Sequence, residues 1–553
     1  MTTQLDVAII GGGPAGSTCG GMLAKYNRRL KVGILEREKF PRDHVGESQL
    51  PFISTILNEL GVWDKVEQAN FPIKIGATYR WGTTPDLWDF EFIPSSEFQD
   101  TLRPAKFEGP RRKTAFQVDR AIYDKILLDH AKGLGCRVQE ETVVRAVERD
   151  GDRVTGLVLD NGDRVEARYY VDCSGHAGII RRAMGVEVAS PTTLQNIAIW
   201  DYWQNAEWAT SIGIGGTRVQ VMSVSYGWIW FIPLGPTRTS VGLIVPATYY
   251  KECGKKPAEL YAEAIAAEPL ISSLLKQAEA EGKLATTKDW SFLSDRLAGE
   301  NWFLAGESAG FADPILAAGM TLAHSAGRDV AYTIMALDRK DYEADWLRSR
   351  YDETHRKRIG QHIRFADFWY TANGQFTDLI DFTRTIAADA GLTLEGKEAW
   401  QWLGTGGFIN EDSVNAGIGG YNLAATKGLT EAFTGEKVAF SVSGKNVFRL
   451  DLEGAEKGWV AWLSEGRINR ARCHQRDGRS LPTIGTYQFL LNVLKQGDTL
   501  AWLEAATGQY IQQSKMPEGA GRAFGARVIE ALEAMVSDGW VHASTDPELP
   551  TLP

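Results

Sequence analysis

The chain has 553 residues, with 60 Lys and Arg against 70 Asp and Glu, so its formal net charge is −10. That length suggests about three folding units, and the acidic balance argues against a general nucleic-acid binder, which needs a basic face. The five cysteines are scattered and form no CxxC pair, which excludes a disulfide-framed secreted scaffold. The eight histidines show no metal-ligand spacing, so we predict no metal centre.

The beginning of the chain passes directly into an apolar segment, with no basic region, signal-peptide core or cleavage site. The sequence holds no run of about 18 apolar residues, so it predicts no membrane span. We therefore expect a cytoplasmic protein, in agreement with unpaired cysteines in a reducing compartment.

The first motif is a glycine-rich turn between a short β-branched run and a helix expected to end near residue 26. Its glycines follow the pattern Gly11-x-Gly13-x-x-Gly16. The first allows a tight turn, the second lets backbone approach a pyrophosphate, and the third allows close helix–strand packing. A second strand at 30–35 ends at Glu36, an acid placed to accept hydrogen bonds from a ribose hydroxyl. Together these elements predict a dinucleotide-binding unit.

Further elements follow along the chain. Residues 119–134 have the amphipathic pattern of a helix, and 154–159 with 164–171 form an expected hairpin around an Asn-Gly-Asp turn. Strand patterns dominate 195–245, and helices return at 258–281. From residue 346 onwards the chain is expected to be mainly helical.

Two later segments extend the nucleotide site. Residues 170–175 close a strand at Gly175, and 302–314 contain a second strand and loop with Gly306-Glu307. With 116–120, these blocks resemble the FAD-binding set of the glutathione-reductase-type flavin monooxygenases, although that family usually has Gly-Asp where this chain has Gly-Glu. The resemblance implies FAD as cofactor, bound by Gly11, Gly13, Pro14, Ala15, Gly16, Glu36, Arg37, Arg42, Ser48, Arg120, Gly175, Gly306, Glu307, Pro314 and Gly319.

The sequence contains no comparable second nucleotide motif. The pattern Gly519-x-Gly521-x-x-x-Gly525 follows a polar loop instead of a strand and has a different spacing. Because a nicotinamide site is not expected, we predict that FAD arrives already reduced by a separate flavin reductase.

The segment 226–233 reads Tyr-Gly-Trp-Ile-Trp-Phe-Ile-Pro. On a strand, alternate residues share a face, so Tyr226, Trp228, Trp230 and Ile232 are expected to form one aromatic wall. A well-packed sheet core is the alternative interpretation. The W-x-W-x-I-P pattern resembles the signature of the flavin-dependent halogenases. This resemblance implies that Trp228 and Trp230 lie beside the flavin and keep organic substrate away, so that halide is oxidised instead.

The same resemblance assigns a lysine and a halide site. Lys74 lies between two isoleucines, in the pattern of the smaller phenol-, pyrrole- and carrier-protein-directed halogenases. A partly buried ammonium has a lowered pKa and can hydrogen-bond hypohalous acid or be halogenated by it; an ordinary surface lysine is the alternative. Halide is expected on the backbone N–H groups of Ala318 and Gly319, where Ala317 replaces the family's usual serine. For Glu47 a structural role is favoured over a catalytic one.

The expected fold is mixed α/β, with a Rossmann-like FAD-binding domain of residues 1–75, 110–185 and 285–345. A β-rich substrate domain (76–109 and 186–284) and a mainly helical C-terminal domain (346–553) complete it. In that last region a tryptophan group either caps a substrate tunnel, docks a carrier protein or forms a plain core. This group comprises Trp400, Trp402, Trp459, Trp462 and Trp502.

The predicted function is a flavin-dependent halogenase. Reduced FAD, O2 and chloride or bromide yield hypohalous acid, which Lys74 relays to an electron-rich aromatic or carrier-tethered acyl substrate. One alternative is an FAD-dependent monooxygenase (hydroxylase) or reductase of the same fold, which would bind NADPH and need no halide. Another is a non-catalytic FAD-dependent sensor or binding module.

Overall fold

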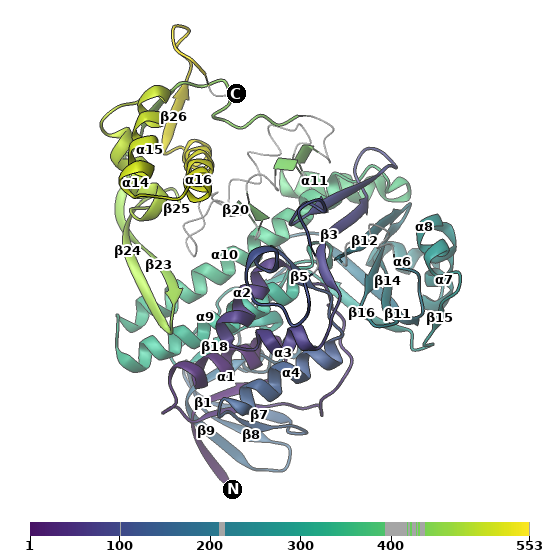
Figure 1. Cartoon of the computed structure of the whole chain (residues 1–553). Helices are drawn as coiled ribbons and strands as arrows, with labels where there is room; N and C mark the ends of the chain where they lie inside the picture. Colours follow the sequence, from purple (N-terminus) through teal and green to yellow (C-terminus); the bar gives the residue numbers. More distant parts are fainter. Residues whose placement is uncertain are drawn as a thin grey trace. The chain divides into compact units, whose positions relative to one another are not determined.

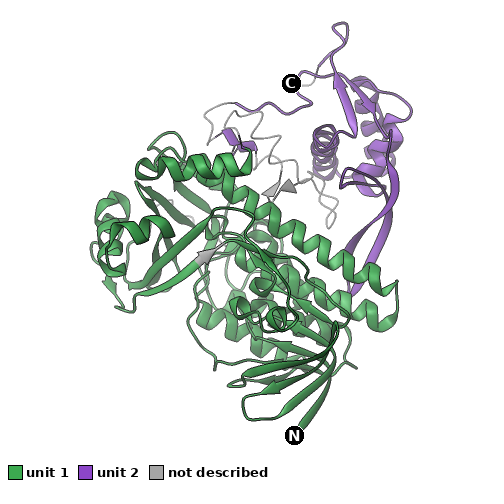
Figure 2. Cartoon of the chain, turned by 180° about the vertical axis from the view of Figure 1, so that it is seen from behind, with its two compact units in different colours: residues 1–391 green, residues 392–553 purple. Residues whose placement is uncertain are grey.

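The computed structural model describes residues 1–99, 101–208, 216–392, 417–418, 421–422, 427–428, 430–431 and 437–551. The chain divides into two compact units, Met1–Gly391 and Leu392–Pro553, which are coloured separately in Figure 2. Several sheets and helices alternate along the chain (Figure 1), so the predicted mixed α/β class is confirmed.

The first sheet of unit 1 runs in the order β6-β2-β1-β9-β8-β7, with β18 beside β9. Its centre is parallel, and the last four residues of β1 are fully buried, as parallel strands covered on both faces are. The hairpin of β8 and β9 agrees with the prediction. The strands are β1 (Thr2–Ile10), β2 (Val32–Leu35), β6 (Arg137–Gln139), β7 (Val144–Asp150), β8 (Arg153–Leu159), β9 (Arg164–Asp172) and β18 (Trp302–Leu304).

Helix α1 (Pro14–Tyr26) follows the glycine turn and contacts α4 (Arg120–Gly133) and α9 (Gly319–Arg339). The predicted helix at 119–134 is confirmed, and Asp119 caps it by accepting a hydrogen bond from Ala121 N. Shorter elements connect the sheet to the rest of unit 1. They are α2 (Pro51–Leu60), α3 (Trp63–Gln68), α5 (Ile179–Ala183), β10 (Val188–Ala189), β17 (Phe292–Ser294) and β19 (Gly310–Phe311).

The second sheet of unit 1 runs in the order β15-β11-β14-β13-β12-β3-β4, with β16 beside β11 and β5 beside β3. On one face, Ile229 and Phe231 pack in an apolar cluster with residues of helices α6 (Ala247–Cys253), α7 (Pro257–Ala267) and α8 (Pro269–Leu274). The strands are β3 (Ile73–Arg80), β4 (Leu87–Glu91), β5 (Ala115–Phe116), β11 (Gln195–Gln204), β12 (Gly216–Val224), β13 (Gly227–Pro233), β14 (Arg238–Pro246), β15 (Glu279–Ala280) and β16 (Ala285–Trp290). The opposite face of β13 carries the side chains of Trp228 and Trp230, both buried.

The boundary of unit 1 differs from the expected one. Helix α10 (Ala344–Thr371) belongs to unit 1 because it packs against α9 and the short turn at Pro314–Leu316. Helix α11 (Ile380–Ala390) follows it, so the compact unit ends at Gly391 instead of residue 345. The sequence predicted a mainly helical chain from residue 346 onwards, but not that its first helix packs on α9.

Unit 2 contains strands as well as helices. The antiparallel sheet β23-β24-β25 and the pair β22-β26 accompany helices α14, α15 and α16, whose rings of Phe489, Tyr510 and Phe524 contact one another. Trp459 and Trp462 lie on β23 and Trp502 lies on α15, whereas Trp400 and Trp402 lie outside the described residues. The elements are β20 (Gly417–Ile418), β21 (Tyr421–Asn422), β22 (Val447–Leu450), β23 (Glu456–Ser464), β24 (Arg467–Arg476), β25 (Arg479–Pro482), α14 (Gly485–Leu494), α15 (Leu500–Gln513), α16 (Glu518–Ser537) and β26 (Val541–Ser544).

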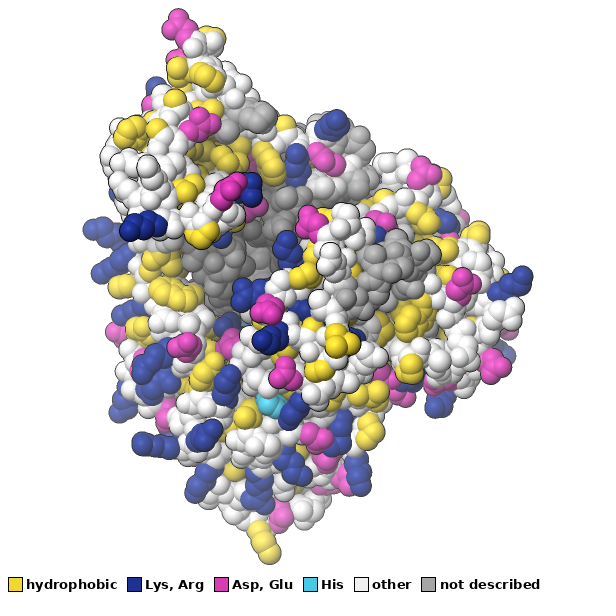
Figure 3. Space-filling view, viewed as in Figure 1, with side chains coloured by type: hydrophobic (Ala, Val, Ile, Leu, Met, Phe, Trp, Pro, Cys, Tyr) yellow, Lys and Arg dark blue, Asp and Glu magenta, His cyan; other side chains and the backbone are white. Residues whose placement is uncertain are grey.

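On the face of the molecule shown in Figure 3, basic and acidic side chains are interspersed. This face therefore lacks the continuous basic surface that nucleic-acid binding requires. None of the helices in the described ranges has the length and apolar character needed to cross a bilayer. In the same ranges, no cluster of His, Cys, Asp and Glu side chains is arranged to hold a metal ion.

Candidate active site

The glycine turn after β1 has little room for side chains. Gly11 has a φ of +100°, and a Cβ there would lie 2.2 Å from the Cys173 carbonyl oxygen. A Cβ on Gly16 would lie 1.9 Å from the Gly11 carbonyl oxygen, so α1 and β1 need glycine at both positions. A Cβ on Gly13 would meet Arg42 at 3.8 Å, which leaves space beside the start of α1. This space has the character of a phosphate cradle at a helix N-terminus.

Glu36 lies against this turn. Its buried carboxylate accepts hydrogen bonds from Gly12 N at 2.6 Å and from Glu38 N at 2.9 Å. The predicted ribose acceptor thus also holds the glycine turn in place. The neighbouring Arg37 has a side chain that is 67% exposed and pairs with Glu38 at 3.3 Å.

Segments far apart in the sequence meet at the glycine turn. A Cβ on Gly306 would lie 3.3 Å from Ala15 Cβ, and a Cβ on Gly175 would lie 3.7 Å from Glu307 Oε2. Both glycines have positive φ, +68° and +63°. The structure therefore brings the three predicted FAD-binding blocks together.

The 42–49 segment is tied to α4 by charge. Arg120 forms a bidentate pair with Asp124, both bonds being 2.8 Å, and donates to the carbonyl oxygens of Val45 and Gly46. Arg42 pairs with the same carboxylate at 2.8 Å. Ser48 Oγ and the Gln49 side-chain amide are buried without a hydrogen-bond partner in the described parts of the chain. Buried polar atoms are normally satisfied, so these atoms fit contact with a bound polar cofactor.

Trp228 and Trp230 share one face of β13, with ring centroids 6.1 Å apart, and both side chains are buried. Trp230 Nε1 donates to Ser240 Oγ at 3.0 Å. The predicted wall needs one correction. Tyr226 precedes the strand in a turn, stacks on Tyr249 at 4.9 Å and belongs to the apolar cluster on the opposite side of the sheet.

Lys74 is 3% exposed on β3, so it is not an ordinary surface lysine. Its Nζ donates to the Gln49 carbonyl oxygen at 3.1 Å and lies 5.3 Å from the centre of the Phe92 ring. Burial lowers the pKa of Lys74 to about 7. An ammonium group with so little polar compensation is held near its titration point at neutral pH.

Strand pairing places Lys74 and the two tryptophans on one face of the second sheet. Lys74 pairs with Thr217 on β12, and Val221 and Ser223 of the same strand pair with Trp230 and Trp228. Residues paired across strands share a face, and alternate residues along β12 do so as well. One strand, β12, lies between Lys74 and the two tryptophans, and along that strand Thr217 precedes Val221 by four residues and Ser223 by six.

The 313–319 segment leads into α9. Asp313 accepts a hydrogen bond from Ile315 N at 2.9 Å, and Ala317 adopts a left-handed conformation with a φ of +51°. Ala318 is the N-cap, and a Cβ on Gly319 would meet no atom within 4 Å. The first N–H groups of a helix have no partner within it, so those of this segment are able to bind an anion. Pro314 begins the short turn that sets the direction of the segment.

A buried network behind this segment was not predicted. The Tyr370 hydroxyl, at the end of α10, contacts Trp228 Nε1, Asn196 Nδ2 and Asp313 Oδ1 at 2.8, 3.1 and 3.3 Å. Burial raises the pKa of Asp313 to about 7. Nothing in the local sequence around Tyr370 signals these contacts, because its partners lie far away along the chain.

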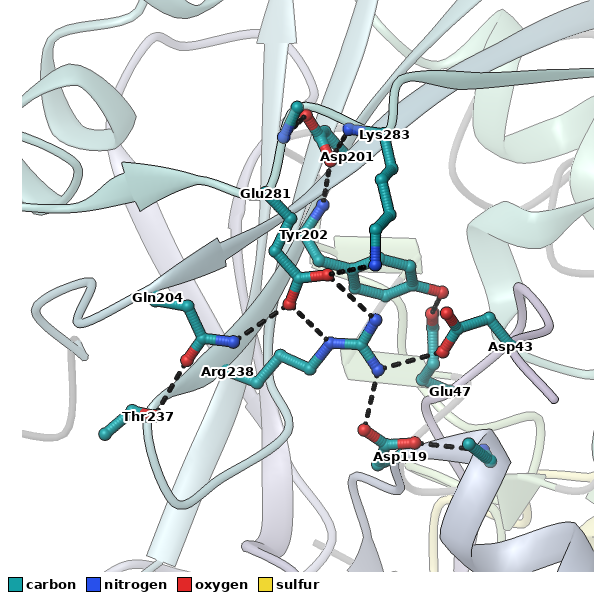
Figure 4. Close-up of polar contacts among 12 residues, drawn as sticks. Asp43, Glu47, Asp119, Asp201, Tyr202, Gln204, Thr237, Arg238, Glu281 and Lys283 are labelled. Carbon is teal, nitrogen blue, oxygen red and sulfur yellow. Dashed lines mark hydrogen bonds and ion pairs between the residues drawn. The ribbon is translucent and has the colours of Figure 1, made fainter. Parts of the chain in front are cut away.

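A second unpredicted network involves Glu47 (Figure 4). Its buried carboxyl accepts a hydrogen bond from the Tyr202 hydroxyl at 3.0 Å, and burial raises its pKa to about 7. The Arg238 guanidinium lies 3.8 Å from the Tyr202 ring centroid. Figure 4 shows Arg238 reaching Asp43, Asp119 and Glu281 together. Glu47 is thus held by contacts that suit a structural role.

Comparison with known proteins identifies the family. The family model described as tryptophan halogenase matches residues 6–103 and 98–378. This chain belongs to the tryptophan halogenase family. A tryptophan 2-halogenase of Chondromyces crocatus is 33% identical over 335 residues, covering 59% of this chain and 60% of that protein. The 1H-pyrrole-2-carbonyl-[peptidyl-carrier protein] chlorinase of Pseudomonas fluorescens is 30% identical over 394 residues, covering 68% of this chain and 86% of that protein.

Solved halogenase structures agree. CmlS, a flavin-dependent halogenase, matches with a TM-score of 0.74 and 25% identity, covering 100% of this chain and 98% of that one. The myxobacterial chondrochloren halogenase CndH matches with a TM-score of 0.61 and 29% identity, covering 67% and 83%. The predicted Rossmann-like FAD fold, the enzymatic nature and the FAD and halide requirement of this halogenase family are therefore confirmed.

Proposed function

We propose that this halogenase uses reduced FAD, O2 and chloride or bromide to form hypohalous acid, which Lys74 relays to an electron-rich substrate. The proposal rests mainly on Lys74, a buried lysine that shares a sheet face with Trp228 and Trp230. The balanced reaction consumes FADH2, O2, a halide ion, a proton and an R–H substrate, and it yields FAD, R–X and two water molecules. Reduced FAD, when bound, supplies the two electrons that reduce O2 alongside halide oxidation.

The residues proposed to hold FAD are the predicted set, Gly11, Gly13, Pro14, Ala15, Gly16, Glu36, Arg37, Arg42, Ser48, Arg120, Gly175, Gly306, Glu307, Pro314 and Gly319. Their support is the glycine cradle, the meeting of Gly175 with Glu307, and the unpartnered hydroxyl of Ser48. Arg37 has the weakest support, since its side chain projects largely into solvent.

Halide is proposed to bind the backbone N–H groups of Ala318 and Gly319. The space beside Gly319 and the start of α9 support this position. Trp228 and Trp230 have the role of a barrier: two adjoining indoles fill the face of β13 and exclude an organic substrate from the flavin side. The oxidant therefore meets halide before it meets an organic carbon.

Lys74 then acts on hypohalous acid. Its Nζ donates a hydrogen bond to the hypohalous oxygen. Alternatively, as a neutral amine it takes the halogen with release of water, and the substrate carbon then takes the halogen while the substrate's proton returns to Nζ. A pKa of about 7 populates both forms at neutral pH. Burial keeps water from competing for Nζ, which directs the halogen to the substrate.

The proposed substrate is an electron-rich aromatic compound or an acyl group on a carrier protein. Support comes from the chlorinase relative and from a brominase of Pseudoalteromonas luteoviolacea, 28% identical over 353 residues, both named for 1H-pyrrole-2-carbonyl-[peptidyl-carrier protein]. A separate flavin reductase is the proposed source of reduced FAD, and a cytoplasmic location remains a prediction.

Substitution of Lys74 tests the relay. Lys74→Ala and the volume-preserving Lys74→Met should lower halogenated product by about 100-fold or more, while oxygen-dependent oxidation of reduced FAD continues. The exposed Lys65→Ala serves as a matched control and should halogenate normally. Full halogenation by both Lys74 variants would contradict the proposal. A hydroxylated product without a halide requirement would support the monooxygenase alternative.

A further inference from the structure

The Tyr370 hydroxyl joins two parts of the proposed site. It accepts hydrogen bonds from Trp228 Nε1 at 2.8 Å and from Asn196 Nδ2 at 3.1 Å, and it donates to Asp313 Oδ1 at 3.3 Å. One hydrogen and both lone pairs of the hydroxyl are thereby used. All four residues are buried. A change at this oxygen therefore reaches the indole and the carboxyl at once, without water to replace it.

Asp313 controls the start of the 313–319 segment. Its Oδ1 also caps Ile315 N, and its Oδ2 accepts the second hydrogen of the Asn196 amide at 3.1 Å. The N–H groups of Ala318 and Gly319 follow a few residues later, after the left-handed Ala317. Because the turn between them is short, the orientation of Asp313 sets the direction of those N–H groups.

Packing fixes the ring of Tyr370. Its centroid lies 5.9 Å from that of Trp81 and 6.0 Å from that of Phe376. Trp81 in turn contacts Trp228 at 6.3 Å and donates from Nε1 to the Trp369 carbonyl oxygen at 2.7 Å. Aromatic contacts thus hold the end of α10 against β13 and the end of β3. They fix the position of the Tyr370 ring and therefore of its hydroxyl oxygen.

We propose that Tyr370 is a positioning residue that holds the Trp228 barrier and the halide-binding N–H groups of the 313–319 segment in fixed relation. This inference rests on the proposed function, which assigns halide to Ala318 and Gly319. Tyr370 touches neither halide nor substrate in this scheme. It acts through Trp228 and Asp313, so that halide binding and substrate exclusion depend on one hydroxyl.

The test compares Tyr370→Phe with Ser240→Ala. Tyr370→Phe keeps the ring and removes the hydroxyl. Ser240→Ala removes the hydroxyl that accepts a hydrogen bond from the other indole, that of Trp230. Among the described contacts, Ser240 has no hydrogen bond to Asp313. Bromide is titrated into each FAD-bound protein and its dissociation constant is read from the flavin absorbance. The KM for bromide and the fraction of consumed O2 that appears as brominated product are measured as well.

Tyr370→Phe should raise the dissociation constant and KM for bromide by about tenfold, the effect of losing one buried hydrogen bond, and lower the product formed per O2. The rate of flavin oxidation should change less than about twofold, and Ser240→Ala should leave bromide affinity within about twofold of wild type. Asn196→Ala, which removes the amide joining Asp313 to Tyr370, should repeat the weaker bromide binding if Tyr370→Phe folds poorly.

Unchanged bromide affinity in Tyr370→Phe, or in Asn196→Ala where Tyr370→Phe is unfolded, would overturn this inference and leave the proposed function standing. An equal loss of affinity in Ser240→Ala would overturn it too, because general loosening of the core would then explain the effect. If wild type binds bromide but forms no brominated product, the proposed function fails, and the comparison of bromide affinities still decides the role of Tyr370.

Discussion

At the scale of single residues, Lys74 combines burial with little polar compensation. Its Nζ has the Gln49 carbonyl oxygen as hydrogen-bond acceptor and lies beside the Phe92 ring. Desolvation of an ammonium group costs free energy, so such a residue weakens the fold unless it remains neutral. A stability cost of this kind is typical of residues retained for chemistry.

Lys74→Met should therefore stabilise the protein, most strongly at and below neutral pH. The folded pKa is about 7 and the usual value is 10.5, so between these values the unfolded state binds more protons and wild-type stability rises with pH. One pKa unit corresponds to about 1.4 kcal/mol, which sets an upper limit of about 5 kcal/mol on the gain. Urea unfolding of both proteins between about pH 6 and pH 10 measures it. A gain that grows with pH would contradict this assignment.

At the scale of elements, Arg238 on β14 connects the second sheet of unit 1 to α4 and to the 42–49 segment. Its guanidinium pairs with Glu281 after β15, with Asp119 at the start of α4 and with Asp43 before the 45–48 loop. The same group covers the Tyr202 ring, whose hydroxyl holds Glu47 (Figure 4). Arg238 thus helps to fix the loop that carries Ser48 and the Gln49 carbonyl oxygen.

Arg238→Gln should lower the free energy of unfolding by about 2–3 kcal/mol, because three carboxylates lose a largely buried partner. FAD affinity should fall as well, since the 42–49 segment loses one of its contacts with the second sheet. Arg238→Lys keeps the charge and should lie between wild type and Arg238→Gln. Urea unfolding and FAD titration check both effects. If Arg238→Gln retains full stability and FAD affinity, the network has no such role.

Local patterns predicted the parts of the fold that depend on neighbouring residues. The glycine turn, the helix starting at Arg120 and the strand with Trp228 each have a signal within a few residues. The contacts of Tyr370 lack such a signal: its bond to Trp228 spans 142 residues and its bond to Asn196 spans 174. Tyr226 was placed on the wrong face because strand alternation was extended one residue beyond the start of β13.

At the scale of the whole molecule, the halogenase family match and the compact unit nearly coincide. The match ends at residue 378, and unit 1 ends at Gly391. Every residue proposed for FAD, halide and Lys74 chemistry lies in unit 1. The strands of unit 2 escaped prediction because β24 (Arg467–Arg476) is rich in polar and charged residues, and neither it nor β23 (Glu456–Ser464) has a regular alternation of buried and exposed positions.

Unit 1 should therefore fold and bind FAD by itself. A protein truncated after Gly391 should unfold in one cooperative step and bind FAD within about threefold of full-length affinity, because its core and cofactor residues are complete. Flavin titration and circular dichroism during heating measure this. A truncated protein that aggregates or releases FAD would show that residues beyond Gly391 complete the fold.

The central claim is halogen transfer to carbon. The most direct measurement supplies the full-length enzyme with reduced FAD, O2 and bromide, together with phenols, pyrroles and carrier-bound pyrrole or aromatic thioesters, and analyses the products by mass spectrometry. We predict a product with the paired isotope peaks of bromine from at least one substrate class, absent when bromide is omitted. Oxidation of FAD with only hydroxylated or unchanged substrates in every class would contradict the account.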